Sequence, residues 1–568
     1  MRKPYIGLEI HVDAADAAEG VRLGFFGFED FFMDKEQERP LVLVIAGVDS
    51  GGGAGVTADV ISVHDQGAWA LPVVTALTCQ SLNRVTLVAP TSVEVFKESI
   101  ALAVHDWSEK ISAIKIGLIT DNNLLNCLLD LLKGPLKGIP VVWDPVLTAT
   151  AGTFKSADIK GKLAEVLKHT TVFTPNLPEA LALAGWDESE LFERGGVFSL
   201  CDVFIKQGAK AVLLKGGHNV SALDAVDVFK CEQHAFVMEH AKKEGLGAHG
   251  GGCALSSSFA ALLACGYAPQ DAAVLAKVYV TRGIFETEVE RKHKRPPISH
   301  HALSYDLKYM PRIIEEHFPQ AAGPFPKCPF NLGLYPVVDN TEILERLLAL
   351  GVKTAQLRIK TPVHDDESDA HLCAEIKRAC FLGRSYRARV FIDDHYKLAA
   401  KYGAYGVHLG MEDLQDADLD FIAESGLRLG VSTHGIYEVC KAMSLQPSYI
   451  AIGHVFPTKT KQMPSQPQGI AKMGLQARML KGVVPTVAIG GIKLQHAHQV
   501  LEEGIDSIAV VTAITEAENP SVETQKWIAV CRTGPSELFG KDAQAWHQRQ
   551  DEQETPELSP LFTFNTKA

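Results

Sequence analysis

The heptapeptide T-A-Q-L-R-I-K, residues 354–360, alternates strictly between polar and apolar side chains. In a β-strand, successive side chains point to opposite faces, so Gln356, Arg358 and Lys360 would line one face. Charged groups need partners when they are buried, so that face is either exposed to solvent or holds an anion. For this stretch alone an exposed edge strand is the simpler interpretation. The sequence on either side of residues 354–360 must decide between an exposed strand and an anion-binding one.

Strand-like runs recur at roughly even spacing after Phe330 and alternate with stretches of helical periodicity. They cover residues 332–338, 354–360, 390–394, 406–410, 428–433, 449–456, 485–490 and 507–513. Eight strand–helix units in about 200 residues are typical of a TIM barrel, whose active site lies at the C-terminal ends of the strands. The sequence therefore predicts a TIM (β/α)8 barrel in the C-terminal half.

Mostly polar residues and glycines lie within or just after the ends of these predicted strands. In chain order they are Gln356, Arg358, Lys360, Asp393, Asp394, His408, Glu412, Asp413, Ser432, His434, Pro457, Thr458, Lys459, Thr460, Lys461, Gly490, Gly491, Val511 and Thr512. Any one of them could be an ordinary surface residue. Because the whole set would meet at one rim of a barrel, the anion-binding interpretation of residues 354–360 becomes the better one.

Six motifs carry a family resemblance in this half. They are L-G-L-Y-P-V-V-D, Q-L-R-I-K, G-V-H-L-G-M-E-D-L, L-R-L-G-V-S-T-H, H-V-F-P-T-K-T-K-Q-M-P-S and V-A-I-G-G-I. Together they resemble the thiamine-phosphate synthases from about residue 330 to 518. The resemblance implies a Mg²⁺-dependent condensation of hydroxymethylpyrimidine diphosphate with thiazole phosphate.

The resemblance also implies roles for individual residues. Gln356, Arg358, Lys360 and Lys461 would bind the diphosphate, Asp393 and Ser432 would lie on the pyrimidine side, and Asp394 and Asp413 would bind Mg²⁺, with Arg358 and Lys461 catalytic. Thr458, Thr460, Gly491, Val511 and Thr512 would bind the thiazole phosphate. Three residues depart from the family pattern: Asp393 replaces Asn, Met411 replaces Gln and Thr512 replaces Ser. An extra carboxylate at Asp393 would alter the charge beside the metal.

The N-terminal half begins with an apolar strand-like run, residues 41–46, followed by the glycine-rich segment 47–55. Further strands are predicted at residues 73–79, 113–118, 141–144, 172–174 and 212–215, with helical stretches between several of them. This order predicts an α/β domain with a largely parallel sheet. A glycine-rich turn between a strand and a helix lets backbone N–H groups approach a ligand.

A second glycine-rich segment, residues 245–252, precedes a predicted helix. The first N–H groups of that helix would favour phosphate. Cys253 would lie at this positive end, where the pKa of a thiol falls. The other interpretation, a small buried residue at a helix start, is equally compatible with the local sequence.

Six motifs carry a second family resemblance. They are A-G-V-D-S-G-G-G-A-G-V-T-A-D, T-A-L-T-C-Q, D-P-V, T-P-N-L-P-E-A, L-K-G-G-H and H-G-G-G-C. From about residue 41 to 284 the chain therefore resembles the hydroxymethylpyrimidine and phosphomethylpyrimidine kinases, which have a ribokinase-like fold. Asp59 and Gln80 would hold the aminopyrimidine, and Asn176, Glu179 and Lys215 would position Mg-ATP. Gly250, Gly251 and Gly252 would form an anion hole, with Cys253 as catalytic base. The departures are Ser50 and Gly51 for Pro and Ser, Thr150 and Ala151 for Lys and Ser, and Gly251 for Thr.

Together the two resemblances imply a bifunctional enzyme of thiamine biosynthesis with ATP as co-substrate. Two alternatives stay open for the kinase half. It could phosphorylate another vitamer, such as a pyridoxine-like alcohol, or it could be reduced to a ligand-binding module, as Thr150 and Gly251 would suggest. The resemblance also leaves open a homo-oligomer formed through the kinase half.

Composition limits the alternatives. The chain has 568 residues, more than one hydrophobic core supports. Its formal net charge of −13 argues against a nucleic-acid-binding surface. Eleven cysteines without a CxxC pair suit the reducing cytoplasm. The chain shows neither an apolar run of membrane-spanning length nor a signal-peptide core.

These observations divide the chain into five predicted parts. They are an unassigned extension (1–38), the kinase domain (39–284), a linker (285–329) with a short helix near 306–317, the barrel (330–530) and a polar, disordered tail (531–568). The proline-rich stretch 320–329 is expected to be an exposed junction.

Overall fold

The computed structural model describes residues 39–81, 84–107, 110–147, 156–216, 224–243, 249–287, 296–319, 323–360, 368–458 and 465–533. These residues fall into a single compact unit that begins at Arg39. No helix among them is both long enough and apolar enough to cross a membrane.

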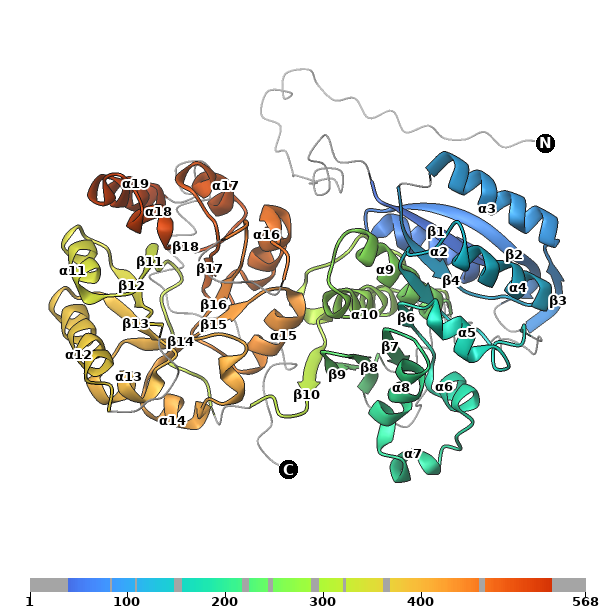
Figure 1. Ribbon diagram of the computed structural model, residues 1–568, viewed down its shortest axis with the longest axis horizontal. Coiled ribbons are helices and arrows are strands. Elements are labelled where there is room, and N and C mark those ends of the chain that lie inside the picture. The colour runs from blue at the N-terminus through green and yellow to red at the C-terminus, as the bar shows by residue number, and fades with distance from the viewer. Residues whose placement is uncertain are drawn as a thin grey trace, which may run out of the picture. The chain divides into compact units, whose positions relative to one another are not determined.

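The N-terminal half contains a sheet whose described strands run in the order β10-β9-β8-β7-β6-β5-β4-β1-β2-β3 (Figure 1). The strands are β1 (Leu41–Asp49), β2 (Trp69–Ser81), β3 (Arg84–Pro90), β4 (Ile111–Ile116), β5 (Val141–Trp143), β6 (Val172–Phe173), β7 (Ala211–Lys215), β8 (Asp224–Cys231), β9 (Ala235–Ala241) and β10 (Arg312–Glu315). Strands β1, β2 and β4 to β7 are parallel, and β3 and β8 to β10 are antiparallel to their neighbours. The prediction of a largely parallel sheet is confirmed.

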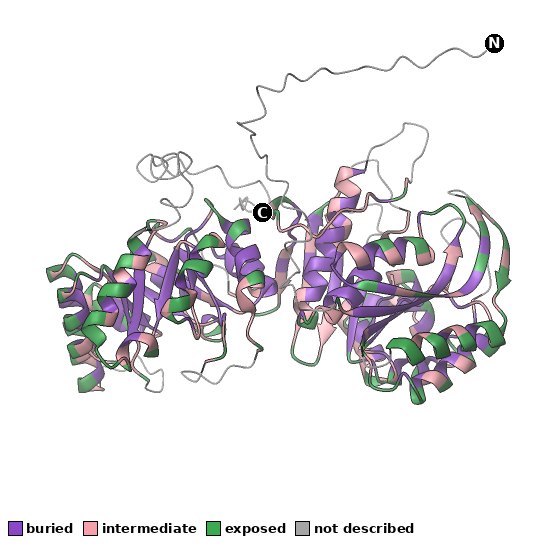
Figure 2. Cartoon of the chain, turned by 90° about the horizontal axis from the view of Figure 1, so that it is seen from above, coloured by how far each residue is buried: buried purple, intermediate pink, exposed green. Residues whose placement is uncertain are grey.

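Helices cover both faces of this sheet. They are α2 (Gly55–Asp65), α3 (Val93–Trp107), α4 (Asn122–Lys133), α5 (Leu163–Lys168), α6 (Leu177–Ala184), α7 (Glu190–Glu193), α8 (Gly196–Lys206), α9 (Gly251–Ala264) and α10 (Pro269–Glu286). Alternate residues of β1 enter different cores: Val42 and Val44 belong to the cluster that contains α9, whereas Leu43 and Ile45 belong to the cluster that contains α4. Figure 2 shows buried strands in the middle of the sheet, such as β1, whereas β3 at its edge is largely exposed. Burial on both faces explains why β1 is a continuous apolar run.

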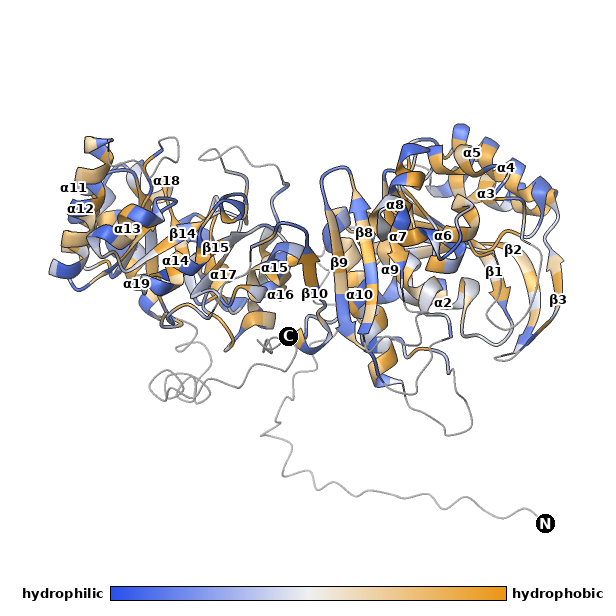
Figure 3. Cartoon of the chain, turned by 90° about the horizontal axis from the view of Figure 1, so that it is seen from below, coloured by the Kyte–Doolittle hydropathy of each residue, from blue (hydrophilic) through white to orange (hydrophobic). Residues whose placement is uncertain are grey.

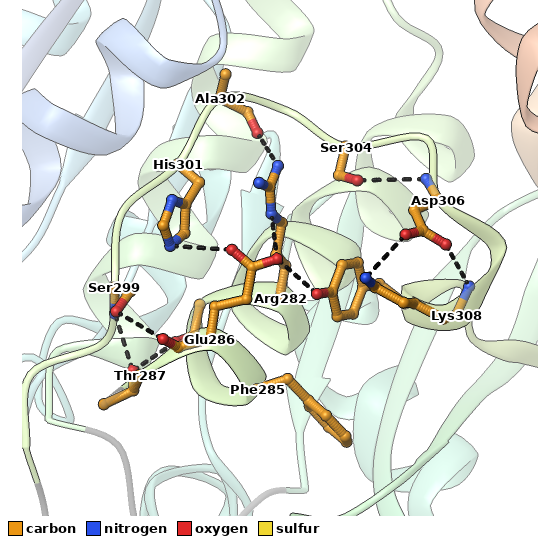
Figure 4. Close-up of polar contacts among 12 residues, drawn as sticks. Arg282, Phe285, Glu286, Thr287, Ser299, His301, Ala302, Ser304, Asp306 and Lys308 are labelled. Carbon is orange, nitrogen blue, oxygen red and sulfur yellow. Dashed lines mark hydrogen bonds and ion pairs between the residues drawn. The ribbon is translucent and has the colours of Figure 1, made fainter. Parts of the chain in front are cut away.

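Much of the segment predicted as a linker, residues 285–329, is part of the folded kinase half. Helix α10 ends at Glu286, whose carboxylate is contacted by Arg282, by the Tyr309 hydroxyl at 2.6 Å and by His301 at 3.2 Å (Figure 4). The chain then forms a short 3₁₀ turn, Leu307–Tyr309, and the edge strand β10, which pairs with β9. The predicted helix at 306–317 is wrong, because Pro311 disfavours helical geometry in the residue before it.

The C-terminal half is a closed parallel barrel with strand order β11 to β18, and the prediction of a TIM barrel is confirmed. Its strands are β11 (Leu334–Val338), β12 (Thr354–Leu357), β13 (Arg389–Asp393), β14 (Gly406–Leu409), β15 (Arg428–Thr433), β16 (Tyr449–Ile452), β17 (Thr486–Ala488) and β18 (Ser507–Val510). Its helices are α11 (Thr341–Ala349), α12 (Ala370–Ser385), α13 (Tyr396–Tyr402), α14 (Leu419–Glu424), α15 (Ile436–Ser444), α16 (Gly469–Leu480), α17 (Ala497–Glu502), α18 (Thr512–Thr515) and α19 (Pro520–Thr533). All eight predicted strands are present, although β12 ends at Leu357 rather than at Lys360.

Aromatic side chains fill the barrel interior. The ring centroids of Tyr335, Phe391 and Tyr449 lie 5.2 to 5.8 Å apart, and the two tyrosine hydroxyls share a 2.8 Å hydrogen bond. A Cβ at Gly430 would overlap the Tyr449 ring, and one at Gly406 would lie 2.6 Å from the Phe391 ring. Glycine at these strand positions therefore makes room for the large rings. Figure 3 shows apolar residues concentrated in the strands and hydrophilic ones on outer helix surfaces.

Two candidate active sites

The two glycine-rich segments of the kinase half pack backbone against backbone. Gly250 has φ of 82°, and a Cβ there would overlap the carbonyl oxygen of Gly53. Gly55 has φ of 60°, and its Cβ would overlap the carbonyl oxygen of Gly47. Both positions therefore require glycine, for conformation and for space. The packing places the start of α9 against the loop that follows β1.

The N-terminus of α9 has the geometry expected of an anion hole. Gly250 is its N-cap, and a glycine supplies no capping side chain. The N–H groups of the next three residues, Gly251, Gly252 and Cys253, have no acceptor within the helix. Such groups, aligned with the helix dipole, favour a negatively charged ligand.

Asp49 and His249 connect the same two segments, and the sequence analysis assigned neither a role. His249 Nε2 lies 2.8 Å from one Asp49 carboxylate oxygen, and the Gly51 N–H donates to the other at 2.8 Å. Burial alone would raise the pKa of Asp49, but the hydrogen bonds from His249 and Gly51 outweigh burial and lower it. The sequence held one signal for these two residues, since each lies within a glycine-rich segment.

Gln80 lies beside the first glycine loop. Its backbone N–H donates to the Ser50 hydroxyl at 2.8 Å, and that hydroxyl donates to the Gln80 carbonyl at 2.9 Å. Because β2 ends at Ser81, Gln80 lies at the C-terminal edge of the sheet, where parallel α/β folds bind ligands. The structure thus brings Gln80 and the glycine loop together.

Asp59, which was expected to hold the aminopyrimidine, is fully buried. One of its carboxylate oxygens accepts from Lys115 Nζ at 2.7 Å and the other from the Ser257 hydroxyl at 2.6 Å. Both oxygens are therefore engaged by the protein. A buried carboxylate needs such partners to offset its loss of hydration.

Asn176, Glu179 and Lys215, the expected Mg-ATP residues, lie close together and beside Asp144. Asn176 and Glu179 form a reciprocal capping box at the start of α6, with both hydrogen bonds at 2.9 Å. Lys215 pairs with Asp144 at 2.6 Å. Burial raises the pKa of Glu179 to about 7, the charge of Lys215 opposes this rise, and that of Asp144 adds to it.

The expected lowering of the Cys253 pKa is wrong for this structure. Burial raises the pKa of the Cys253 thiol to about 11, although the charge of Lys115 and the N–H of Gly55 act in the opposite direction. Loss of hydration around the thiolate outweighs these two favourable contributions. Thr150 lies outside the described residues, so its departure from the kinase pattern has no structural account.

In the barrel, the polar face of β12 converges on one carboxylate. Gln356 Nε2 donates to Asp393 Oδ1 at 2.5 Å, and Arg358 Nε lies 2.9 Å from Asp393 Oδ2. Lys360, three residues beyond the end of the strand, is exposed. Burial and the neighbouring Asp394 raise the pKa of Asp393 well above its usual value, and Arg358 opposes this.

Asp394 and Asp413 lie near Asp393, since both charges act on it. Asp394 follows β13 with φ of 61°, a backbone conformation that concentrates at functional sites. Asp413 follows β14 and accepts the Gly410 N–H at 3.1 Å. Within the described residues no metal-like group of three or more His, Cys, Asp or Glu side chains occurs. Mg²⁺, however, typically uses one or two carboxylates with water and substrate phosphate, and this donor set fits it.

His408 is a buried residue to which the sequence analysis assigned no role. Its Nε2 lies 2.8 Å from the Ser432 hydroxyl, and its Nδ1 lies 2.7 Å from the Tyr449 hydroxyl. The chain of hydrogen bonds continues to Tyr335 in the barrel interior. These hydrogen bonds orient Ser432 at the rim. In the sequence, only the position of His408 in a predicted strand could have indicated this role.

Those expected thiazole-phosphate residues that the structure describes, Thr458, Gly491, Val511 and Thr512, follow β16, β17 and β18. Gly491 has φ of 65°, and its Cβ would lie 2.5 Å from the Pro457 carbonyl oxygen, so this glycine lets the loop after β17 approach the loop that carries Thr458. Val511 and Thr512 form the start of α18, directly after β18. Thr460 and Lys461 lie outside the described residues.

Comparison with known proteins identifies both halves. A model of the phosphomethylpyrimidine kinase family matches residues 49–299, and one of the thiamine monophosphate synthase family matches residues 334–514. The kinase half thus has the expected ribokinase-like fold, with its sheet between two layers of helices.

Individual proteins are also similar to parts of this chain. A thiamine-phosphate synthase from Salmonella paratyphi A is 54% identical over 210 residues, which are 37% of this chain and 97% of that protein. The crystal structure of a phosphomethylpyrimidine kinase from Clostridium difficile 630 is similar at 28% identity and a TM-score of 0.36, covering 43% of this chain and 98% of that one. The chain therefore belongs to the thiamine-phosphate synthase family through its barrel, and it carries a phosphomethylpyrimidine kinase domain ahead of that barrel.

Proposed function

We propose that the two halves catalyse successive steps of thiamine biosynthesis. The kinase half transfers phosphoryl groups from ATP to 4-amino-5-hydroxymethyl-2-methylpyrimidine and to its monophosphate. The barrel then joins the resulting diphosphate to thiazole phosphate, which yields thiamine phosphate and pyrophosphate. The observation that carries this proposal is that one chain matches both families, each over a site suited to anions.

In the kinase half, the N–H groups at the start of α9 stabilise the negative charge that develops on the transferred phosphoryl group. Lys215 adds a positive charge beside Gly252, since its Nζ would lie 3.4 Å from a Cβ at that position. Cys253 accepts the proton of the substrate hydroxyl once its thiol is ionised. Gln80 binds the aminopyrimidine at the sheet edge, and Asn176 and Glu179 position Mg-ATP.

In the barrel, the leaving pyrophosphate must be neutralised as it departs. Arg358 and Lys360 supply positive charge from the end of β12, and Lys461 supplies more. Asp394 and Asp413 would hold Mg²⁺, which supplies charge neutralisation at the phosphate oxygens. Ser432, held by His408, contacts the pyrimidine, and the loops that carry Thr458, Gly491 and Thr512 bind the thiazole phosphate.

We further propose a reducing compartment, the cytoplasm, as the site of action. All eleven cysteines are free thiols, several of them buried, which suits a chain that never depends on a disulfide.

A coupled assay tests the proposal. Supplied with the hydroxymethylpyrimidine, ATP, Mg²⁺ and thiazole phosphate, the purified chain should produce thiamine phosphate, and omission of ATP should abolish production. Supplying the pyrimidine diphosphate directly should restore it without ATP. A chain that converts the diphosphate but never the alcohol would contradict the kinase assignment, and pyridoxine as the alcohol would then reveal a different vitamer specificity.

A further inference from the structure

Lys115 is a fully buried cation on β4 whose presence the fold does not explain. Its Nζ donates to Asp59 at 2.7 Å, and Asp59 is held in turn by the Ser257 hydroxyl. A Cβ at Gly117 would lie 2.8 Å from this Nζ, so glycine preserves the space beside the ammonium group. An apolar pair of similar volume would be equally stable or more stable in most proteins.

The position of this ion pair relative to α9 suggests what it does. Ser257 lies four residues after Cys253, so the two side chains occupy the same face of the helix. The hydrogen bond from Ser257 to Asp59 therefore places the Lys115–Asp59 pair beneath the face that carries Cys253.

The charges around Cys253 come from four elements and differ in their effect. Lys115 on β4 favours the thiolate more than any other charge, and Lys215 on β7 also interacts with it. Asp59 on α2 and Asp144 after β5 favour the neutral thiol. Burial dominates and keeps the pKa high, so ionisation of Cys253 depends on a nearby cation.

We propose that Lys115 is a positioning residue of the kinase reaction, whose buried ammonium is the fixed counter-charge of the Cys253 thiolate and is held in place by Asp59 and Ser257. This proposal rests on the proposed role of Cys253 as base. Lys115 keeps its proton throughout: burial disfavours its charged form, but the negative charges of Asp59, Cys253 and Asp144 and the hydrogen bond to Asp59 together outweigh burial and raise its pKa. The Cys253 proton leaves to solvent, and the thiolate then accepts the proton of the substrate hydroxyl.

The test measures the thiol directly, without turnover. The full-length, unliganded chain is alkylated with iodoacetamide across a pH series, and the rate at Cys253 is read from its peptide by mass spectrometry. Lys115→Met should raise the pKa of Cys253 and slow its alkylation at least about tenfold at fixed pH, since one pKa unit is a tenfold change in thiolate fraction.

Lys115→Gln, which still donates a hydrogen bond to Asp59, should do the same and serves if the methionine variant does not fold. Asp59→Asn should act in the opposite direction and speed alkylation.

Lys277→Met is the matched control. Lys277 forms a second buried pair in the same half, with Asp227 at 2.6 Å, and its loss should leave Cys253 alkylation unchanged. Equal rates in the wild type and both Lys115 variants would overturn the proposal, as would Lys115→Gln and Asp59→Asn shifting the rate in the same direction. A separate result, a Cys253→Ala variant with wild-type kinase turnover, would refute the base assignment and not the pairing of charges.

Discussion

Cys253 combines a position suited to catalysis with a resting state that is not. The helix N-terminus and the glycine packing favour an anion at this point. Burial nevertheless raises the pKa of the thiol to about 11. The thiolate must therefore be produced by the charges around it, and substrate phosphates or ATP could change that balance when they bind.

We predict that Cys253→Ala lowers kinase turnover and leaves synthase turnover unchanged. Loss of a positioned general base typically costs about 10²- to 10⁴-fold. Both rates should be measured on one preparation. Kinase turnover at the wild-type level would restrict the role of Cys253 to its backbone N–H in the anion hole.

Asp413 offers the cleaner test of the metal pair, because Asp393 could partly replace Asp394. Asp413→Ala should lower synthase turnover at saturating Mg²⁺ by about 10²- to 10³-fold, the usual effect of removing one electrostatic group that acts on developing charge. Asp418→Ala is the control, since Asp418 caps α14 through the Phe421 N–H and is expected to cost stability only. If both variants keep normal synthase turnover, Asp413 does not bind the metal.

Glu179 predicts a pH dependence of stability. Burial raises its pKa from 4.5 to about 7, so the folded state binds this proton more tightly than the unfolded state does. The stability from this group is fully present below pH 4.5 and is lost as the pH rises through about 7. Glu179→Gln should flatten that part of the curve, measured by thermal unfolding of the kinase half at several pH values. A slope identical to the wild type would exclude Glu179 as its source.

At the scale of single elements, the close contact between the loop after β1 and the start of α9 creates the kinase site. Gly250→Ala would force a Cβ into the Gly53 carbonyl oxygen and displace the first turn of α9. We expect kinase turnover to fall at least about tenfold and synthase turnover to persist. An alanine in left-handed geometry costs about 1 to 2 kcal/mol anywhere.

Gly185→Ala is the control that separates the cost of left-handed backbone geometry from the displacement of α9. Gly185 also has a positive φ, 69°, but a Cβ there meets nothing within 4 Å. This variant should lose similar stability and keep its kinase turnover. Equal loss of turnover in both variants would show that the contact between the glycine segments is not what matters.

At the scale of the whole molecule, the kinase half supplies a cap to a barrel helix. The barrel helix α15 begins after Gly435, which has no capping side chain, and Asp271 of α10 accepts the Tyr437 N–H at 2.9 Å. The Tyr437 hydroxyl donates to Glu315 of β10 at 2.8 Å. Phe325 and Cys328, in the stretch expected to be an exposed junction, are buried. One hydrophobic cluster contains residues of both halves.

We therefore predict that a chain cleaved at an engineered protease site within residues 320–322 stays associated. Its two pieces should co-elute in gel filtration, with both activities present. Asp271→Ala should weaken the association, because an N-cap is worth about 1 kcal/mol, whereas Asn340→Ala, which removes a cap internal to the barrel, should not. Separation of the unmutated pieces would contradict this prediction and show that the contacts between the halves do not hold them together.

The sequence by itself determined the two folds and where along them most of the candidate site residues lie. A continuous apolar β1 requires burial on both faces, and eight regularly spaced strand–helix units permit few arrangements other than a closed barrel. Strand ends then place Gln356, Asp394 and Asp413 at one rim, because parallel strands end on the same side. The glycine-rich segments predicted an anion hole at the start of α9, because glycine lets the backbone adopt the required conformation and approach a ligand.

The tertiary structure alone decided what depends on contacts between distant segments. Hydrogen bonds join Asp59 to Lys115 and Ser257, Asp393 to Gln356 and Arg358, and Ser432 to His408. No local sequence pattern predicts such pairings. The pKa of Cys253 is raised by burial, to which several elements contribute. β10 joined the kinase sheet because β9 left an unpaired edge, a fact that the linker sequence does not contain.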